Sequence, residues 1–295
     1  MEHRSSYLDE YKIEGAVNLD GNPCFESEDT FTSFQEKLEE FKQLLVSAVD
    51  ESKSLTFYKF GDGDYHFLKQ NAIGSAAPGR RALSRSYGNI KHEEFVDGCK
   101  LCDYYTCEIY PQNRSLFKEV IGRDADYPAE FVYGLTSNGW LTKTFAGQIG
   151  IIGAEQKVSL IKSMMEKQEY KEYLGLDSFE DYLHVPQRFA CDDIDATEKM
   201  IADQLVQSKS KIFLLGFGHV KSALLHRLKK YKDAIFLDVG SSIDALAGIV
   251  DHNRPYMGKW INHRVQDFDY SSLDILQYDI WNTPYKMMEN WWKFT

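Results

Sequence analysis

The chain has 295 residues and a mass of 34.1 kDa, with 34 Lys and Arg against 45 Asp and Glu, a formal net charge of −11 and a pI near 5.3. Hydrophobic residues make up 43% and aromatic residues 14% of it, so the chain can bury a core and does not have the composition of a disordered protein. The acidic balance argues against a nucleic-acid polymer as partner. No apolar run reaches the ~18–20 residues of a transmembrane segment, and the start lacks signal-peptide features, so we expect a soluble, cytoplasmic protein.

The five cysteines predict buried thiols rather than a disulfide framework. Cys24 and Cys191 lie far from Cys99, Cys102 and Cys107 in the sequence. Cys99 and Cys102 have the C-x-x-C spacing of a zinc half-site or a redox pair, but no second cysteine pair or His-x-His partner accompanies them. We therefore expect ordinary buried thiols.

The first part of the chain is polar and then helical. Phe34, Leu38, Phe41 and Leu45 recur at helical spacing and form one apolar stripe. Residues 1–50 are therefore predicted to be a helical N-terminal extension.

From residue 51 onward, short apolar runs alternate with helical segments. A β-rich run ends in the turn Gly61–Asp64, and later apolar runs are each followed by a helical pattern, at 149–153, 183–186, 211–215 and 234–239. This alternation predicts one α/β domain over residues 51–260, with a mostly parallel sheet flanked by helices.

An aromatic C-terminal extension follows at residues 261–295 and is expected to pack on the same domain. Trp281, Tyr285, Met288, Trp291 and Trp292 fall roughly on one helical face. A terminal helix docked on the core is the expected role. A homo-oligomer contact and an acceptor-binding surface are the alternatives.

Ligands of open α/β sheets bind at the carboxyl ends of the strands, and the first predicted strand ends in two carboxylates. Asp62 and Asp64 are separated by one residue and flanked by glycines, so both can face one hard cation such as Mn²⁺ or Mg²⁺. The alternative is an Asp-Gly turn whose carboxylates bond their own backbone.

A second strand end carries the turn Gly216-Phe217-Gly218. A G-x-G turn that opens a helix presents backbone N–H groups to an anion, although Lys221 stands where a dinucleotide fingerprint has its third glycine. His219 is a candidate catalytic base there. The alternative roles are tight helix–sheet packing for the glycines and helix capping for His219.

The third strand end is acidic. Asp238 follows Gly216 by 22 residues, which is where an acidic residue would bind a ribose hydroxyl. The turn from Asp238 to Ser241 also resembles the acidic-glycine turn of S-adenosylmethionine methyltransferases. Asp244 is the second candidate base, or else an acidic residue at the start of a helix.

Two basic clusters could contact phosphates. Arg80 and Arg81 lie in a loop-like segment with Arg85 nearby, and Arg254 lies close to Lys259 in the sequence. Arginine suits bidentate phosphate contacts, whereas a solvated loop is the alternative for either cluster.

The segment Phe57–Asp64, near the start of a parallel α/β domain, is similar to the metal-binding segment of the GT-D-type glycosyltransferases, in which a strand ends in a Phe-Gly-Asp-Gly-Glu turn. The strand ends at 216–219 and 237–241 are similar in placement to the Rossmann-like second half of that family. Asp64 in place of glutamate is the one departure. Over residues 50–260 the resemblance implies a Rossmann-like fold and a nucleoside-diphosphate sugar, commonly a uridine one, held through a divalent cation on Asp62 and Asp64.

We therefore expect a metal-dependent glycosyltransferase that moves a sugar from a nucleotide-sugar donor to a hydroxyl of a glycan or other acceptor. Its expected residues are the metal ligands Asp62 and Asp64, the catalytic candidates Asp244 and His219, and a donor-binding set of Phe60, Gly61, Gly63, Arg80, Arg81, Gly216, Gly218, His219, Lys221, Asp238, Ser241 and Arg254. The first alternative is a methyltransferase or another nucleotide-cofactor α/β enzyme. The second is a non-catalytic α/β module that binds a partner.

Overall fold

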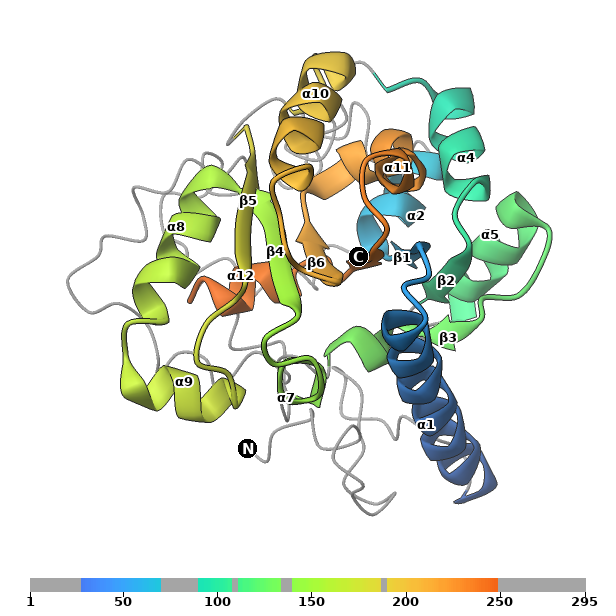
Figure 1. Ribbon diagram of the computed structural model, residues 1–295. Helices are drawn as coiled ribbons and strands as arrows, with labels where there is room; N and C mark the ends of the chain where they lie inside the picture. Colours follow the sequence, from blue (N-terminus) through green and yellow to red (C-terminus); the bar gives the residue numbers. More distant parts are fainter. Residues whose placement is uncertain (1–27, 70–89, 108–110, 134–139, 187–189, 249–295) are drawn as a thin grey trace, which may run out of the picture.

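The computed structural model describes residues 28–69, 90–107, 111–133, 140–186 and 190–248 (Figure 1). The aromatic extension at 261–295, the basic residues Arg80, Arg81 and Arg254, and Cys24 lie outside these ranges. The four described cysteines are buried free thiols, as predicted: Cys99, Cys102, Cys107 and Cys191.

The described chain is an α/β structure with a seven-stranded, all-parallel sheet, which confirms the predicted Rossmann-like fold class. The strand order is β3-β2-β1-β7-β6-β4-β5. The strands are β1 (Leu55–Phe60), β2 (Tyr104–Cys107), β3 (Tyr127–Pro128), β4 (Ile149–Ala154), β5 (Asp181–Val185), β6 (Ile212–Gly216) and β7 (Ile235–Asp238).

Helices cover both faces of the sheet because its connections run in two directions (Figure 1). The connections β1 to β2, β2 to β3, β5 to β6 and β6 to β7 all run towards β3 in the sheet order, whereas those leaving β3 and β4 run towards β5. Right-handed crossovers place the two sets on opposite faces.

Two apolar clusters follow from this division. One face carries α2 (Asp62–Leu68), α4 (His92–Lys100), α5 (Pro111–Ile121), α10 (Ile194–Leu205), the short 3-10 helix η4 (Gly218–Val220), α11 (Lys221–Leu224) and η5 (Leu225–Lys230). The other face carries α1 (Glu28–Asp50), η3 (Ala129–Tyr133), α7 (Trp140–Thr144), α8 (Glu155–Met164), α9 (Gln168–Leu174) and α12 (Ser242–Leu246).

Helix α1 is part of the second core face. Its residues Leu38, Phe41 and Leu45 are buried, as the predicted apolar stripe requires. The Phe41 ring contacts the Phe57 ring of β1 edge to face, with centroids 5.7 Å apart. Truncation of such a fully buried phenylalanine costs about 3–5 kcal/mol, so α1 contributes strongly to the stability of the sheet it covers.

A glycine brings α4 and α11 into close contact on the first face. A Cβ on Gly98 of α4 would lie 1.8 Å from the carbonyl oxygen of Ser222 in α11, so only glycine permits this approach. The contact fixes the position of α11, which begins with Lys221. Among the described helices, none is long and apolar enough to cross a membrane.

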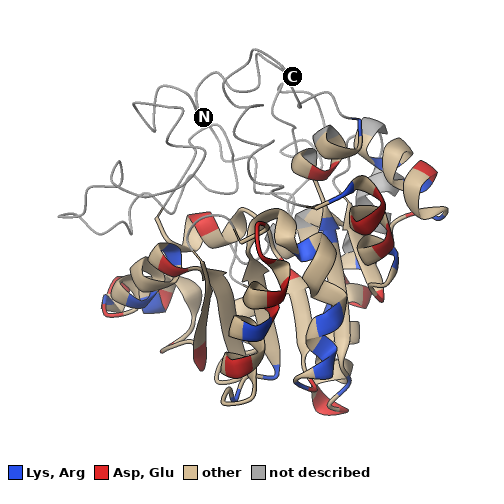
Figure 2. Cartoon of the chain, turned by 90° about the horizontal axis from the view of Figure 1, so that it is seen from above, with Lys and Arg blue, Asp and Glu red and all other residues tan. Residues whose placement is uncertain are grey.

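Charged residues lie mainly on the outer helices. Figure 2 shows Lys and Arg interspersed with Asp and Glu on these helices, while the strands are largely uncharged. Lys59 of β1 and Asp238 of β7 are exceptions, because both are buried charged residues.

Candidate functional site

The three predicted strand ends lie side by side. Strand β7 is hydrogen-bonded to β1 on one side and to β6 on the other, so the turns that follow these three strands meet at one edge of the sheet. This is the edge at which open α/β sheets bind ligands.

The side chain of Lys221 joins these turns. Its Nζ lies 2.8 Å from Oδ2 of Asp238 and 3.3 Å from Oδ2 of Asp64, and it also donates a hydrogen bond to the main-chain carbonyl of Lys59. The ammonium lies 4.4 Å from the ring centroid of Tyr58. Burial acts to lower the pKa of Lys221, but the carboxylates of Asp238 and Asp64 outweigh it and hold that pKa above its ordinary value.

Asp64 is the third residue of α2 and is buried beneath the turn after β1. Its Oδ1 accepts a hydrogen bond from the Tyr58 hydroxyl at 2.6 Å, and its Oδ2 accepts one from the Gly61 N–H at 2.8 Å. Burial alone would raise the pKa of Asp64. The charge of Lys221, with a smaller contribution from His219 and these hydrogen bonds, lowers it instead, so the carboxylate is ionised at neutral pH.

This arrangement does not fit Asp64 as a direct metal ligand. Both of its oxygens accept hydrogen bonds from protein donors, and the cation beside it is the Lys221 ammonium. Asp64 matches the alternative prediction of an Asp-Gly turn whose carboxylate bonds its own backbone, because it accepts a hydrogen bond from the Gly61 N–H. No group of three or more His, Cys, Asp or Glu suited to a metal occurs in the described part of the chain. The side chain of Asp62 lies outside the described residues, so its role as a metal ligand stays a prediction.

His219 packs directly on the turn after β1. A Cβ on Gly63 would lie 2.5 Å from Cε1 of the His219 ring, which explains why a glycine occupies position 63. Burial lowers the pKa of His219 to about 4, and the charge of Asp64 only partly opposes this. The ring is therefore neutral at neutral pH, and a group with this pKa is a weak general base.

The second candidate base, Asp244, lies on the other face of the sheet. It is an acidic residue in the first turn of α12 and forms an ion pair with Lys157 of α8. This placement matches the alternative role of an acidic residue at a helix start. The structure thus puts His219 and Asp244 on helices that cover opposite faces of the sheet.

Asp238, predicted to bind a ribose hydroxyl, is bonded to the protein itself. Its Oδ1 accepts a hydrogen bond from the Gly240 N–H at 2.9 Å, and its Oδ2 accepts one from the Lys59 N–H at 3.1 Å in addition to Lys221. The carboxylate is 3% exposed. It therefore fixes the turn before α12 rather than offering an open acceptor.

The glycines of this edge have different roles. Gly216 allows packing, because a Cβ there would lie 2.5 Å from Cγ1 of Ile243, and Gly61 uses its N–H on Asp64. Gly218 is exposed, adopts a φ of +66°, and has no atom of the described residues within 4 Å of the position of a Cβ. Among the described residues, none fills the space beside Gly218, whereas the space beside Gly216 is filled by Ile243.

Phe60 and Ser241 complete the described predictions. The Phe60 side chain is buried and contacts Phe117 edge to face, with centroids 5.5 Å apart, so it is a core residue rather than a ligand contact. Ser241 immediately precedes α12 and makes no side-chain cap to that helix.

Sequence reasoning missed Lys59 and Tyr58, which belong to β1. Lys59 is only 7% exposed, and its Nζ lies 3.7 Å from the position of a Cβ on Gly240, a residue with a φ of +52°. The sequence did contain a signal, which is a single lysine inside a run that has the pattern of a buried strand. Buried lysines are rare and are usually paired.

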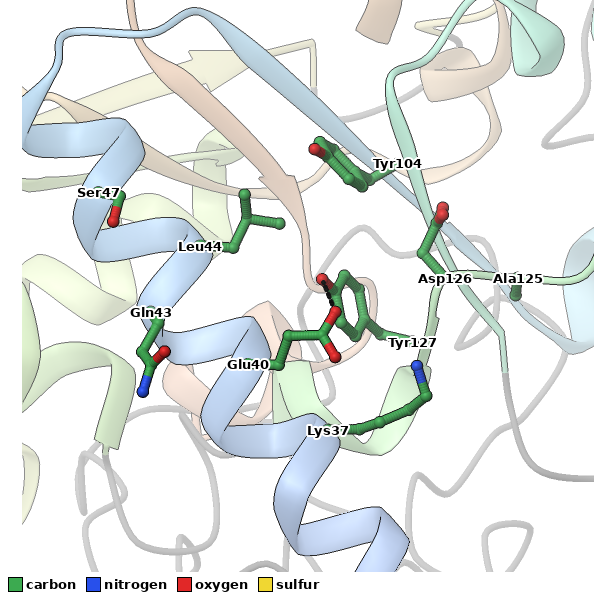
Figure 3. Close-up of a pocket in the computed structure, with 9 residues that line it drawn as sticks. All are labelled: Lys37, Glu40, Gln43, Leu44, Ser47, Tyr104, Ala125, Asp126 and Tyr127. Atoms are coloured by element: carbon green, nitrogen blue, oxygen red, sulfur yellow. Dashed lines mark hydrogen bonds between the residues drawn. The ribbon is translucent and has the colours of Figure 1, made fainter.

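A groove of about 620 Å³ lies elsewhere, between α1 and the starts of β2 and β3 (Figure 3). Tyr104 and Tyr127, which are the first residues of those strands, line it together with Glu40 of α1, which accepts a hydrogen bond from the Tyr127 hydroxyl at 3.1 Å. The groove thus belongs to the amino ends of the strands, away from the candidate site.

Comparison with protein-family models, with curated proteins and with solved structures gives no match for this chain. The fold defines a Rossmann-like α/β protein, and the site is a buried network of two carboxylates and an ammonium at the carboxyl edge of its sheet.

Proposed function

We propose that this protein is a glycosyltransferase that moves a sugar from a nucleoside-diphosphate donor, UDP being the first candidate, to a hydroxyl acceptor. The observation that carries the proposal is the convergence of the ends of β1, β7 and β6, with Lys59, Lys221 and the open Gly218 turn at one edge. The turn at the end of β1 is also the segment that is similar to the GT-D-type glycosyltransferases.

The buried network would supply a fixed frame for the donor. Asp64 and Asp238 each bond both a main-chain N–H and the Lys221 ammonium, so the turns after β1 and β7 are held together. A positive group that is already in place stabilises charge on a departing diphosphate without reorganisation. Lys59, whose Nζ lies beside Gly240, would face this charge from β1.

A divalent cation remains part of the proposal only through Asp62. When bound, Mn²⁺ or Mg²⁺ would neutralise the leaving diphosphate as a Lewis acid. Asp62→Asn is expected to weaken any Mn²⁺-dependent binding of UDP, whereas Asp203→Asn, at an exposed residue paired with Lys199, is the matched control that should not.

The proposal is tested by thermal shift with UDP, GDP and S-adenosylmethionine, each with and without Mn²⁺. A nucleoside diphosphate at about 100 times its Kd should stabilise the folded chain by about 2.7 kcal/mol. Stabilisation by S-adenosylmethionine that is indifferent to metal would favour a methyltransferase. No response to any nucleotide would favour a non-catalytic module.

A substitution of Lys59 connects the binding to this edge of the sheet. Lys59→Met keeps an unbranched side chain that is one heavy atom shorter and removes its charge, so the affinity for UDP should fall about tenfold or more. Lys37→Met, at a lysine of the distant groove in Figure 3, should leave it unchanged. Slow hydrolysis of a panel of nucleotide sugars would then identify the donor without knowledge of the acceptor.

A further inference from the structure

The Lys221 ammonium is surrounded by oxygen atoms of the kind that bind a cation. The Oδ2 atoms of Asp238 and Asp64 and the carbonyl oxygen of Lys59 all accept hydrogen bonds from its Nζ. A lysine ammonium has three N–H donors, so each donor has an oxygen partner. The ring of Tyr58 lies 4.4 Å from the ammonium and adds a cation–π contact.

Burial strongly favours a cation at this position. The side chains of Asp64 and Asp238 are each 3% exposed and that of Lys221 is 12% exposed. Two carboxylates that share one buried position repel each other unless a positive charge lies between them. In sites that hold a divalent ion, the ion supplies this charge.

We infer that Lys221 is the built-in cation of this site and that its ammonium occupies the position between Asp64 and Asp238 that a divalent ion could otherwise take. Lys221 is thus a positioning residue, which acts on the turns after β1 and β7 through the two carboxylates. Asp64 orients the turn after β1 and does not ligate a metal, so a metal used with a nucleotide is held without it. Only this last consequence rests on the proposed function.

Removal of the ammonium should convert the position into a true metal site. Lys221→Ala leaves two carboxylates and a carbonyl, the oxygen ligands that Mn²⁺ prefers, together with space for water. Millimolar Mn²⁺ should then raise the Tm of this variant by about 5 °C or more beyond any rise seen in the wild type. The double variant Lys221→Ala/Asp64→Asn should lose this additional rise.

Lys229→Ala is the matched control. The ammonium of Lys229, in η5, lies 2.7 and 2.8 Å from the two oxygens of Asp103, so it is also a lysine paired with a carboxylate but is not enclosed by two of them. Mn²⁺ should stabilise Lys229→Ala no more than the wild type. A Lys221→Ala variant without additional stabilisation, or a double variant that keeps all of it, would overturn the inference.

A second measurement uses the wild-type protein and does not depend on the folding of any variant with a lost charge. An ammonium with three acceptors should give a slowly exchanging side-chain signal in ¹⁵N NMR, assigned by its absence in Lys221→Arg. Millimolar Mg²⁺ should leave this signal in place, and its shift or loss would refute the inference. Neither readout needs a nucleotide, so a protein that binds no UDP contradicts the proposed function alone.

Discussion

The carboxylate of Asp238 offers the sharpest test of the buried network. In Asp238→Asn one oxygen becomes an amide NH₂ group. In one orientation the NH₂ group replaces Oδ1, which in the wild type accepts a hydrogen bond from the Gly240 N–H at 2.9 Å. In the other it replaces Oδ2, which accepts hydrogen bonds from the Lys221 ammonium at 2.8 Å and from the Lys59 N–H at 3.1 Å. Either orientation places the NH₂ donor against another hydrogen-bond donor. The substitution also removes one of the two negative charges that balance the Lys221 ammonium.

Removal of one partner from a buried ion pair typically costs about 3–5 kcal/mol. Because Asp64 still contacts the ammonium, we expect the lower value, about 3 kcal/mol. For a domain of this size that loss corresponds to a fall in Tm of about 6–12 °C. Since the total stability of a domain is about 5–15 kcal/mol, the variant should still fold.

The assay is urea denaturation at neutral pH, with thermal unfolding followed by circular dichroism as the second measure. Asp203→Asn is the matched control, because the side chains of Asp203 and Lys199 are 67% and 76% exposed and such surface pairs contribute about 0–1 kcal/mol. If Asp238→Asn cost no more than the control, the network would not carry the stability that we attribute to it.

Three further perturbations follow from described contacts. Gly98→Ala places a Cβ 1.8 Å from the Ser222 carbonyl oxygen and should lower the free energy of unfolding by about 1–3 kcal/mol or more in urea, and an unchanged midpoint would contradict the packing of α4 on α11. Tyr58→Phe removes the hydroxyl that donates to Asp64 at 2.6 Å and should cost about 1.5–3 kcal/mol by the same assay, so a neutral effect would show that the carboxylate does not depend on this donor. Burial lowers the pKa of His226 from 6.5 to about 4, so between these pH values the unfolded chain binds a proton that the folded chain does not. Stability should therefore fall as the pH decreases from 6.5 to 4, and urea titrations across this range should show a smaller dependence for His226→Gln; an equal dependence would contradict the shift.

Long apolar runs made much of the fold predictable. The run at 55–60 coincides with β1, and the run at 149–153 lies within β4. The shortest elements gave no such signal. Strand β3 has only two residues, and α2 begins directly at the Asp-Gly turn, so neither shows a period that can be recognised.

The sequence predicted where the candidate site lies, but not which of its residues contact one another. Asp64, Lys221 and Asp238 were selected because they lie at or shortly after strand ends, and these strand ends do meet. Phe60 shows the limit of that reasoning, since its position after an apolar run does not reveal that its ring is part of the core. The partner of a side chain depends on sheet order, which local patterns do not encode.

By itself, then, the sequence determined the α/β alternation and the polar strand ends, because both are local patterns of apolar and polar residues. Only the tertiary structure decided what those polar residues do. Lys221 is 157 positions from Asp64 and 17 from Asp238, and it contacts both because β7 lies between β1 and β6 in the sheet. That strand order brings an ammonium between the buried carboxylates of Asp64 and Asp238, a contact that no local sequence pattern indicates.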